Sequence, residues 1–248
     1  MKKNVNVIIT IALILTLVAF FISYMITDTE DYKEPIKNAY PLAEKLDFTN
    51  DDAKLFAIIY LGDSKDSYNE KYYINKYFKD MFTYNKTIYK VTEILGLIAL
   101  LIVAIYGLVG LVQLIKRKSF CKVDKRIYIL GAFYVLVGLI YVFFEKVVIN
   151  YRPVIMDGKL EASFPSSHTV LAICVCISAI SINKFYIKDE SKLKLANVFI
   201  MILMTLIVIG RFISGVHWFS DIIGGIIISS TLLSYYFSLN RLFLERHE

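Results

Sequence analysis

The sequence predicts an all-α, polytopic membrane protein with six transmembrane helices and a small helical extracytoplasmic insert. Hydrophobic residues make up 57% of the 248-residue chain, and its mean hydropathy is +0.57. A soluble domain of ordinary composition is less apolar than this. The apolar residues also lie in separate runs, most of them long enough to cross a bilayer as a helix. Charged residues are concentrated between the runs, and this alternation predicts the spans.

The first span is expected within residues 1–26, where Met1 to Lys3 precede an apolar run from Val5 to Ile26. This start resembles a cleaved signal peptide, but the run is longer than the roughly 7–15 residues of a signal core. Bulky residues follow it, and no small-x-small cleavage site is present. We therefore expect an uncleaved transmembrane anchor, with a cleaved signal as the alternative.

Residues 27–90 are polar, charged and rich in tyrosine, and they contain no run long enough to cross a membrane. Two short helices are predicted there, over Lys54–Leu61 and Ser67–Phe82, from helical spacing and a start signal at Thr49. The stretch is expected to form an extracytoplasmic helical insert that acts as a packed cap or spacer. The alternative is a lid that inserts Leu55 and nearby apolar side chains into the membrane interface.

Residues 91–240 are predicted to form a five-helix membrane core, followed by a cytoplasmic tail over 241–248. The basic loop after the second span and the mixed charged loop after the fourth separate these helices. The five predicted spans are Val91–Ile115, Ile127–Val148, His168–Ile182, Leu195–Ile213 and Ser220–Leu239.

The charges of the loops predict the orientation of the chain. With both termini in the cytoplasm, Lys2, Lys3, the loops 116–126 and 184–194 and the tail hold 14 of the 28 Lys and Arg but 5 of the 22 Asp and Glu. Cytoplasmic loops carry such an excess of Lys and Arg. The remaining short loops, which join the third span to the fourth and the fifth to the sixth, are then expected at the outer face.

A charged trio interrupts the apolar sequence between the last two spans. Arg211, His217 and Asp221 occur in the stretch "RFISGVHWFSD". Ionisable residues in a membrane segment are costly and therefore mark functional sites. If a helix begins near His217, Asp221 shares its face and can hold one ring nitrogen while the other reacts. A turn between helices with an interfacial ion pair is the structural alternative.

Two upstream stretches extend the pattern. "SFPSSHT", residues 163–169, places His168 just before an apolar run, and Arg152-Pro153 precedes it by a short loop. The three stretches together resemble the signature of the phosphatidic acid phosphatase type 2 superfamily, which includes the vanadium haloperoxidases. The resemblance covers about residues 127–239, and the third motif has the family spacing from Arg211 through His217 to Asp221.

The sequence departs from the family pattern at three positions. Gly210 replaces a serine in the third motif, and Ser167 replaces a glycine in the second. In the first motif Glu145 occupies the place of the family lysine, and Lys146 is one residue too close to Arg152. A shift of one residue rotates a helical side chain by about 100°. Lys146 could still reach a bound phosphate if its long side chain bends or if the helix unwinds before Pro153. Glu145 could be a structural partner for Lys146 or an arginine.

The resemblance implies a phosphatase that works through a phosphohistidine. A histidine that a carboxylate orients is a competent nucleophile towards phosphorus. We assign nucleophilic attack to His217 and its orientation to Asp221. His168 is expected to protonate the leaving group and then to activate water.

The phosphate is expected to be held without a metal. Bidentate arginine donors, a hydroxyl and the amides of a helix start suit an anion. No carboxylate cluster or metal-binding cysteine pattern is present, and the three cysteines are expected to be small buried or loop residues. We therefore expect no metal, no cofactor and no nucleic-acid partner. The predicted phosphate-binding residues are Arg152, Arg211, Ser166, Ser167 and Lys146.

The predicted function is hydrolysis of a lipid phosphate monoester or diphosphate at the outer face of the cell membrane. Candidate substrates are undecaprenyl diphosphate, phosphatidylglycerophosphate and phosphatidic acid. One alternative is a vanadate haloperoxidase, which the membrane spans disfavour because those relatives are soluble. The other is a non-enzymatic or degenerate transport or scaffold protein, for which Glu145 is the one supporting residue.

Overall fold

The computed structural model describes residues 78, 81–149, 151–154 and 161–244. Within these ranges the chain is helical, apart from its turns and an isolated β-bridge between Tyr151 and Ala162. The predicted first span, the two short insert helices up to Tyr77 and the last four residues of the tail lie outside the described residues. The architecture below is therefore that of the predicted five-helix core.

Five long helices occupy the positions of the five predicted core spans, and each is long and apolar enough to cross a membrane. A short 3-10 turn, η2 (Phe120–Lys122), follows the first of them. The all-helical membrane fold is confirmed for this part of the chain. The helices are α5 (Lys86–Arg117), α6 (Lys125–Lys146), α7 (Ser167–Tyr186), α8 (Glu190–Ile213) and α9 (Phe219–Leu244).

Polar side chains set several helix starts. Asn85 accepts hydrogen bonds from the backbone N–H groups of Thr87 and Ile88, so α5 begins at Lys86, inside the stretch that the sequence assigns to the insert. Asp124 and Asp189 cap α6 and α8 in the same way. Such caps satisfy N–H groups that have no partner within the helix. The caps explain why α5 and α8 begin about one turn before the predicted spans.

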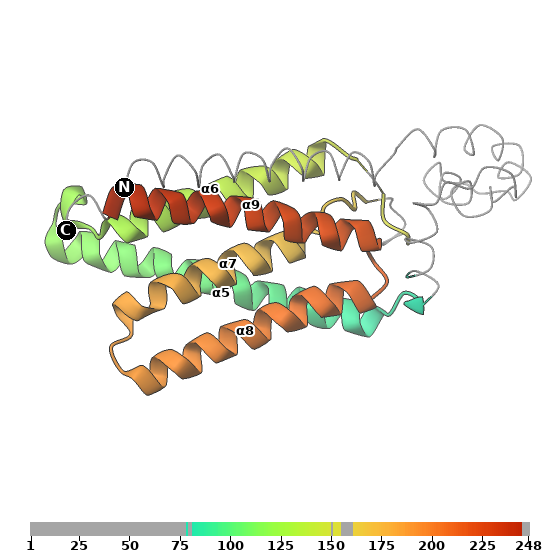
Figure 1. Ribbon diagram of the computed structural model, residues 1–248, viewed down its shortest axis with the longest axis horizontal. Coiled ribbons are helices and arrows are strands. Elements are labelled where there is room, and N and C mark those ends of the chain that lie inside the picture. Colours follow the sequence, from blue (N-terminus) through green and yellow to red (C-terminus); the bar gives the residue numbers. More distant parts are fainter. Residues whose placement is uncertain (1–77, 79–80, 150, 155–160, 245–248) are drawn as a thin grey trace, which may run out of the picture.

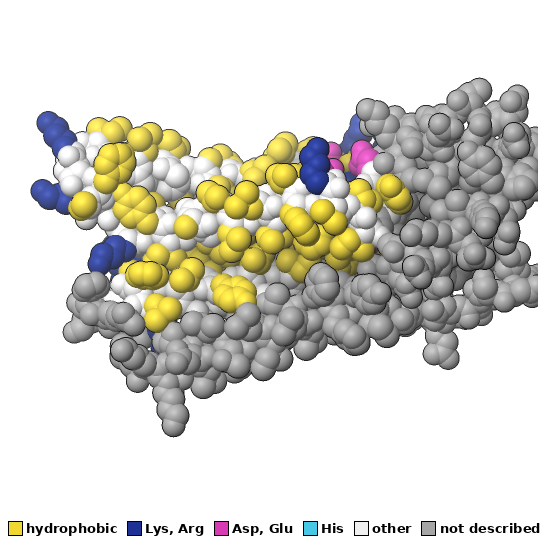
Figure 2. All heavy atoms as spheres, turned by 90° about the horizontal axis from the view of Figure 1, so that it is seen from above, with side chains coloured by type: hydrophobic (Ala, Val, Ile, Leu, Met, Phe, Trp, Pro, Cys, Tyr) yellow, Lys and Arg dark blue, Asp and Glu magenta, His cyan; other side chains and the backbone are white. Residues whose placement is uncertain are grey.

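Successive helices run in opposite directions along the bundle (Figure 1). The end of α5, the start of α6, the end of α7 and the start of α8 therefore meet at one end, which carries the two charged loops. Figure 2 shows an apolar belt on one face, with Lys and Arg gathered at this end and further charges at the opposite end. That opposite end, called here the motif end, holds Arg152, His168, Arg211 and His217.

Helices α7 and α9 form the interior of the bundle. In their apolar windows 56% and 50% of the residues are buried, compared with 17–22% in the other three helices. Those three helices present large apolar side chains to the surroundings, as expected for lipid-facing helices. The start of α7, which carries the second motif, is thus held on several sides.

Small residues bring α5 against its neighbours near the motif end. A Cβ atom on Gly210 would lie 2.4 Å from Cγ2 of Thr92, and one on Gly96 would lie 2.8 Å from Cδ2 of His168. Close helix approach over small residues is typical of membrane proteins. These two contacts bring α5 next to the motif residues of α7 and α8.

Candidate active site

A tight turn between α8 and α9 positions His217. Gly215 has φ of +70°, a conformation that side chains with a Cβ rarely adopt. A Cβ on this glycine would also lie 2.5 Å from the carbonyl oxygen of Phe82. The backbone N–H of Asn85 donates to the carbonyl of Ser214 across 2.9 Å. The segment that leads into α5 thereby fixes the turn, and His217 follows it as a buried residue.

His217, Asp221 and Ser163 form a buried group. Nδ1 of His217 lies 3.5 Å from Oδ2 of Asp221 and 3.3 Å from Oγ of Ser163. The Ser163 hydroxyl also donates a hydrogen bond to Oδ2 of Asp221. With acceptors on this side, the ring carries its proton on Nδ1 and keeps the lone pair on Nε2. Ser163 contacts both residues and can therefore help Asp221 to orient the His217 ring.

Asp221 also joins the starts of α7 and α9. Its Oδ2 accepts the backbone N–H of Trp218 at 2.9 Å, which caps the first turn of α9. Its backbone carbonyl accepts the N–H of Ser166 at 3.0 Å, immediately before α7. The second and third motifs are thus fixed to each other through one residue.

Arg211 is fully buried in the last turn of α8, and α5 holds it in place. Its NH2 donates to Oε1 of Glu93 across 3.0 Å. The guanidinium carbon lies 4.8 Å from the ring centre of Tyr89, close enough for a cation–π contact. Tyr89 and Glu93 are four residues apart and so lie on one face of α5.

His168 lies beside the same carboxylate. Its Nε2 is 3.8 Å from Oε1 of Glu93, and its side chain keeps 25% exposure at the start of α7. The site therefore opens to the surroundings on the side of His168 and Glu93, whereas His217 and Arg211 form its buried wall.

Arg152 reaches the site from the loop between α6 and α7. Its NH2 lies 3.2 Å from Oε2 of Glu161, and its backbone N–H donates to the carbonyl of Glu161 at 3.0 Å. Next to it, the carbonyl of Tyr151 accepts Nε1 of Trp218 at 2.7 Å, which ties the loop to the turn of His217.

The electrostatics of the site keep His217 neutral. Burial, together with the positive charges of Arg152 and Arg211, holds the pKa of His217 well below its usual value. At neutral pH, His217 is therefore a base with a free lone pair.

Several nitrogen atoms of the site lack a partner within the part of the chain that the structure describes. Of five such buried side-chain nitrogens, four belong here: Nε2 of His217, Nε and NH1 of Arg211 and NH1 of Arg152. A buried polar group left unpaired costs about 1–3 kcal/mol. One acceptor and three cationic donors on residues of the motif end suit an oxyanion whose central atom the histidine can attack.

The family comparison agrees with this arrangement. The profile described as the PAP2 superfamily matches residues 101–243, which is more than half of the chain. The chain belongs to the PAP2 superfamily. No curated protein matches the sequence.

A solved structure shares the fold. It is the "first transmembrane PAP2 type phosphatidylglycerolphosphate phosphatase from Bacillus subtilis", with a TM-score of 0.51 and 16% sequence identity. The match covers 71% of this chain and 89% of that chain. At this identity, the likeness shows the fold alone.

The structure explains two positions at which this sequence differs from the PAP2 family pattern. Gly210 replaces the family serine where Thr92 of α5 leaves no room for a side chain. At the first motif, α6 ends at Lys146, and the backbone from Val147 to Ile149 is not helical. The regular rotation of about 100° per residue therefore does not apply between Lys146 and Arg152, and the spacing of the two residues does not determine whether their side chains lie on the same side. Both Glu145 and Lys146 are exposed, and neither makes an ion pair with a residue that the structure describes.

The structure brings His217, Asp221, His168, Arg211, Arg152 and Ser166 of this PAP2 protein together at the motif end. Ser166 is buried and accepts a hydrogen bond from Thr169, while Ser167 opens α7 and is partly exposed. Their contact with a phosphate, and that of Lys146, stay predictions.

Two site residues were missed from the sequence. Glu93 was assigned to the second span without a role, although it is the one charged residue between Val91 and Ile115. A single charged residue in a predicted span indicates a functional site, so the sequence did contain a signal for Glu93. Ser163 stood at the edge of the second motif, and no sequence signal indicated its contact with Asp221.

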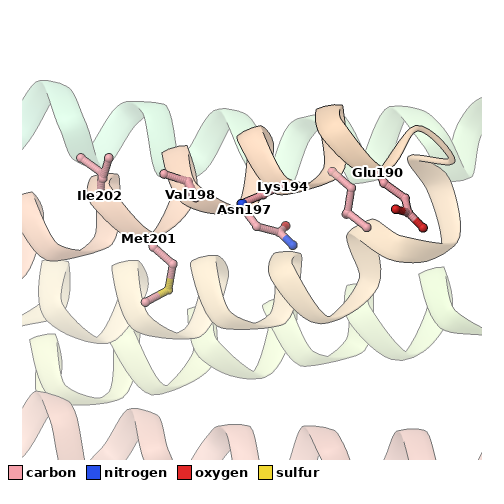
Figure 3. Close-up of a pocket in the computed structure, with 7 residues that line it drawn as sticks. Glu190, Lys194, Asn197, Val198, Met201 and Ile202 are labelled. Atoms are coloured by element: carbon pink, nitrogen blue, oxygen red, sulfur yellow. The ribbon is translucent and has the colours of Figure 1, made fainter.

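Metal ligation has no support among the described residues, where no group of three or more His, Cys, Asp or Glu could hold an ion. A groove does lie along the charged-loop end of α8 (Figure 3), far from the motif end in the fold. Its lining is Glu190, Leu193, Lys194, Asn197, Val198, Met201 and Ile202. None of these residues belongs to the site described above.

Proposed function

We propose that this protein is a membrane phosphatase that removes a terminal phosphate from a lipid at the outer membrane face. The observation that carries the proposal is a set of four buried nitrogens on His217, Arg211 and Arg152 that have no partner among the described residues. Membership of the PAP2 superfamily and five membrane-crossing helices support the same conclusion.

The first step is attack of the Nε2 lone pair of His217 on phosphorus. The N–P bond forms as the bond from phosphorus to the lipid oxygen breaks, and His168, as imidazolium, gives its proton to that oxygen. Asp221 and Ser163 accept hydrogen bonds from Nδ1–H and stabilise the positive ring. Arg152 and Arg211 balance the charge on the phosphoryl oxygens.

The second step regenerates the enzyme. His168, now neutral, takes a proton from water as the water oxygen attacks the phosphohistidine. The N–P bond breaks, inorganic phosphate leaves, and the lone pair returns to Nε2 of His217. Because two arginines and the amides at the start of α7 supply the positive charge, the reaction is expected to need no metal.

The proposed substrates are lipids with a phosphate group at the membrane surface. A glycerophospholipid monophosphate is one class, and it is supported by the structural neighbour, which is a phosphatidylglycerolphosphate phosphatase. A prenyl diphosphate is the other, because its leaving group is itself a phosphate and needs less protonation. Side-by-side turnover of phosphatidylglycerophosphate and undecaprenyl diphosphate by the purified protein would distinguish them. The outer-face orientation rests on the loop charges.

The decisive experiment measures phosphate release from both lipids in detergent, with EDTA present. We expect turnover in EDTA, inhibition by vanadate, and labelled phosphate trapped on the wild-type protein after quenching in an alkaline denaturant. His217→Ala should abolish turnover and trapping, while Ser230→Ala, on the exposed face of α9, should change neither. Loss of activity on chelation and its return with a divalent ion would contradict the proposal, as would near-native turnover by His217→Ala.

A further inference from the structure

Glu93 is a carboxylate that contacts two residues of the proposed mechanism at once. Its Oε1 lies 3.0 Å from NH2 of Arg211 and 3.8 Å from Nε2 of His168. These partners come from the end of α8 and the start of α7, and Glu93 lies two helical turns inside α5. A carboxylate in a membrane helix is costly, and such residues are usually paired and mark functional sites.

We infer that Glu93 is a positioning residue that keeps His168 ready to protonate the leaving group and anchors Arg211 for phosphate binding. The inference rests on the proposed function, because it assigns Glu93 to the same site. Glu93 lies in α5, which carries none of the three sequence motifs.

The charges around His168 explain the first part of this role. The Glu93 carboxylate lies 3.8 Å from Nε2 of His168, and the same oxygen pairs with the Arg211 guanidinium at 3.0 Å. Donation of a proton requires the imidazolium, which nearby cations disfavour and a nearby carboxylate favours. Glu93 is the one carboxylate within 4 Å of His168 among the described residues, so removing its charge would disfavour the imidazolium.

The anchoring of Arg211 explains the second part. Glu93 occupies NH2 alone, and Nε and NH1 of Arg211 have no partner among the described residues. A phosphate can therefore accept an N–H of Arg211 without displacing the carboxylate. This arrangement fits an anchor rather than an internal inhibitor that fills the phosphate position.

The test uses two substrates that differ in their need for an acid. An alkyl phosphate releases a poor leaving group that His168 must protonate, whereas p-nitrophenyl phosphate releases a good one. Glu93→Gln keeps an oxygen that accepts from Arg211 but removes the charge beside His168. We expect kcat/KM to fall at least about tenfold on the alkyl phosphate and less than about threefold on p-nitrophenyl phosphate. The ratio of the two values does not depend on how much of the preparation is folded.

A second variant tests the anchor. Glu93→Ala removes the acceptor as well as the charge, so we expect KM for p-nitrophenyl phosphate to rise about tenfold above that of Glu93→Gln. The matched control is Glu190→Gln, the same change in a carboxylate at the opposite end of the bundle, which should leave both substrates unaffected.

Three results would overturn the inference. An equal loss on both substrates in Glu93→Gln would remove the link to His168, and equal KM values in the two Glu93 variants would remove the anchor. Faster turnover in either variant would make Glu93 an inhibitor of the empty site. If the wild type releases phosphate neither from these two esters nor from the two lipids of the proposed function, that function fails, and this inference fails with it.

Discussion

Oγ of Ser163 lies 3.3 Å from Nδ1 of His217, the nitrogen that also faces Asp221. Because the same hydroxyl donates to Asp221, its oxygen can accept a hydrogen bond from Nδ1–H and so join the ring to the carboxylate. The direct distance from His217 to Asp221 is 3.5 Å, which is long for a hydrogen bond. Ser163 thus supplies part of the orientation that the sequence assigns to Asp221 alone.

Replacing Ser163 with alanine should therefore slow turnover without removing it. A neutral hydrogen bond is worth about 1 kcal/mol, so kcat should fall about fivefold, with little change in KM. Phosphate release under saturating substrate measures this. The control is Ser230→Ala, which removes a hydroxyl that bonds within α9 only. Unchanged kcat in Ser163→Ala would show that Asp221 orients the ring by itself.

Asp221→Asn should separate folding from chemistry. The amide oxygen can still accept the N–H of Trp218, so the start of α9 should persist. The charge that supports the ring as it becomes positive is lost, and turnover should fall about 10²- to 10⁴-fold. Thermal unfolding in detergent and phosphate release should be measured on the same sample. A near-native rate would contradict the role of Asp221, whereas loss of folding would show that its cap dominates.

The pH dependence of His217 follows from its lowered pKa. An ordinary histidine is half protonated near pH 6.5, whereas burial and the two arginines keep His217 neutral in the folded protein at that pH. We expect ¹⁵N spectra of histidine-labelled protein to show the neutral Nδ1–H form at pH 6.5, with the signal assigned by its loss in His217→Ala. A ring half protonated at or above pH 6.5 would contradict this.

The same shift predicts a change in stability with a definite sign. Below about pH 6.5 His217 binds a proton in the unfolded chain but stays neutral in the folded protein. The free energy of unfolding should therefore decrease as pH falls. Above that pH, both states hold a neutral ring, and this residue should contribute no slope. His217→Ala should remove its share of the slope in thermal unfolding measured between pH 5 and pH 8.

Sequence reasoning located the spans and the motif residues because both depend on short-range patterns. Apolar runs determine which segments cross a membrane, and the offset of four between His217 and Asp221 places them on one helix face. Alternating helix directions then bring Arg152 and His168 to the same end. None of these steps requires knowledge of how the helices pack.

Contacts between distant helices were beyond that reasoning. Glu93 lies 118 positions before Arg211, and Ser163 lies 58 before Asp221. The sequence alone does not explain why Gly210 replaces the family serine, whereas the structure shows that Thr92 of α5 packs against this position. Each of these follows from which helix faces which, and helical periodicity alone does not determine this.

Glu145 and Lys146 are the two candidates for the role of the family lysine in the first motif, and replacing them should have different effects on turnover. Helix α6 ends at Lys146, and the non-helical residues after it allow the lysine to turn towards Arg152. A lysine beside a bound phosphate gains Coulomb energy, whereas the Glu145 carboxylate would lose it. We therefore expect Lys146 to contact the phosphate in place of the family lysine.

Lys146→Ala should then raise the barrier by about 1.5–3 kcal/mol, which slows kcat/KM about tenfold to a hundredfold. Arg152→Ala should cost at least as much, because it removes a bidentate donor from the same anion. Glu145→Ala should have little effect, and Lys194→Ala at the opposite end of the bundle serves as the matched control. If Glu145 instead holds an arginine in place, its replacement should slow turnover, and Lys146→Ala should be silent. Measuring kcat/KM for this pair of variants on one lipid substrate therefore decides which residue replaces the family lysine.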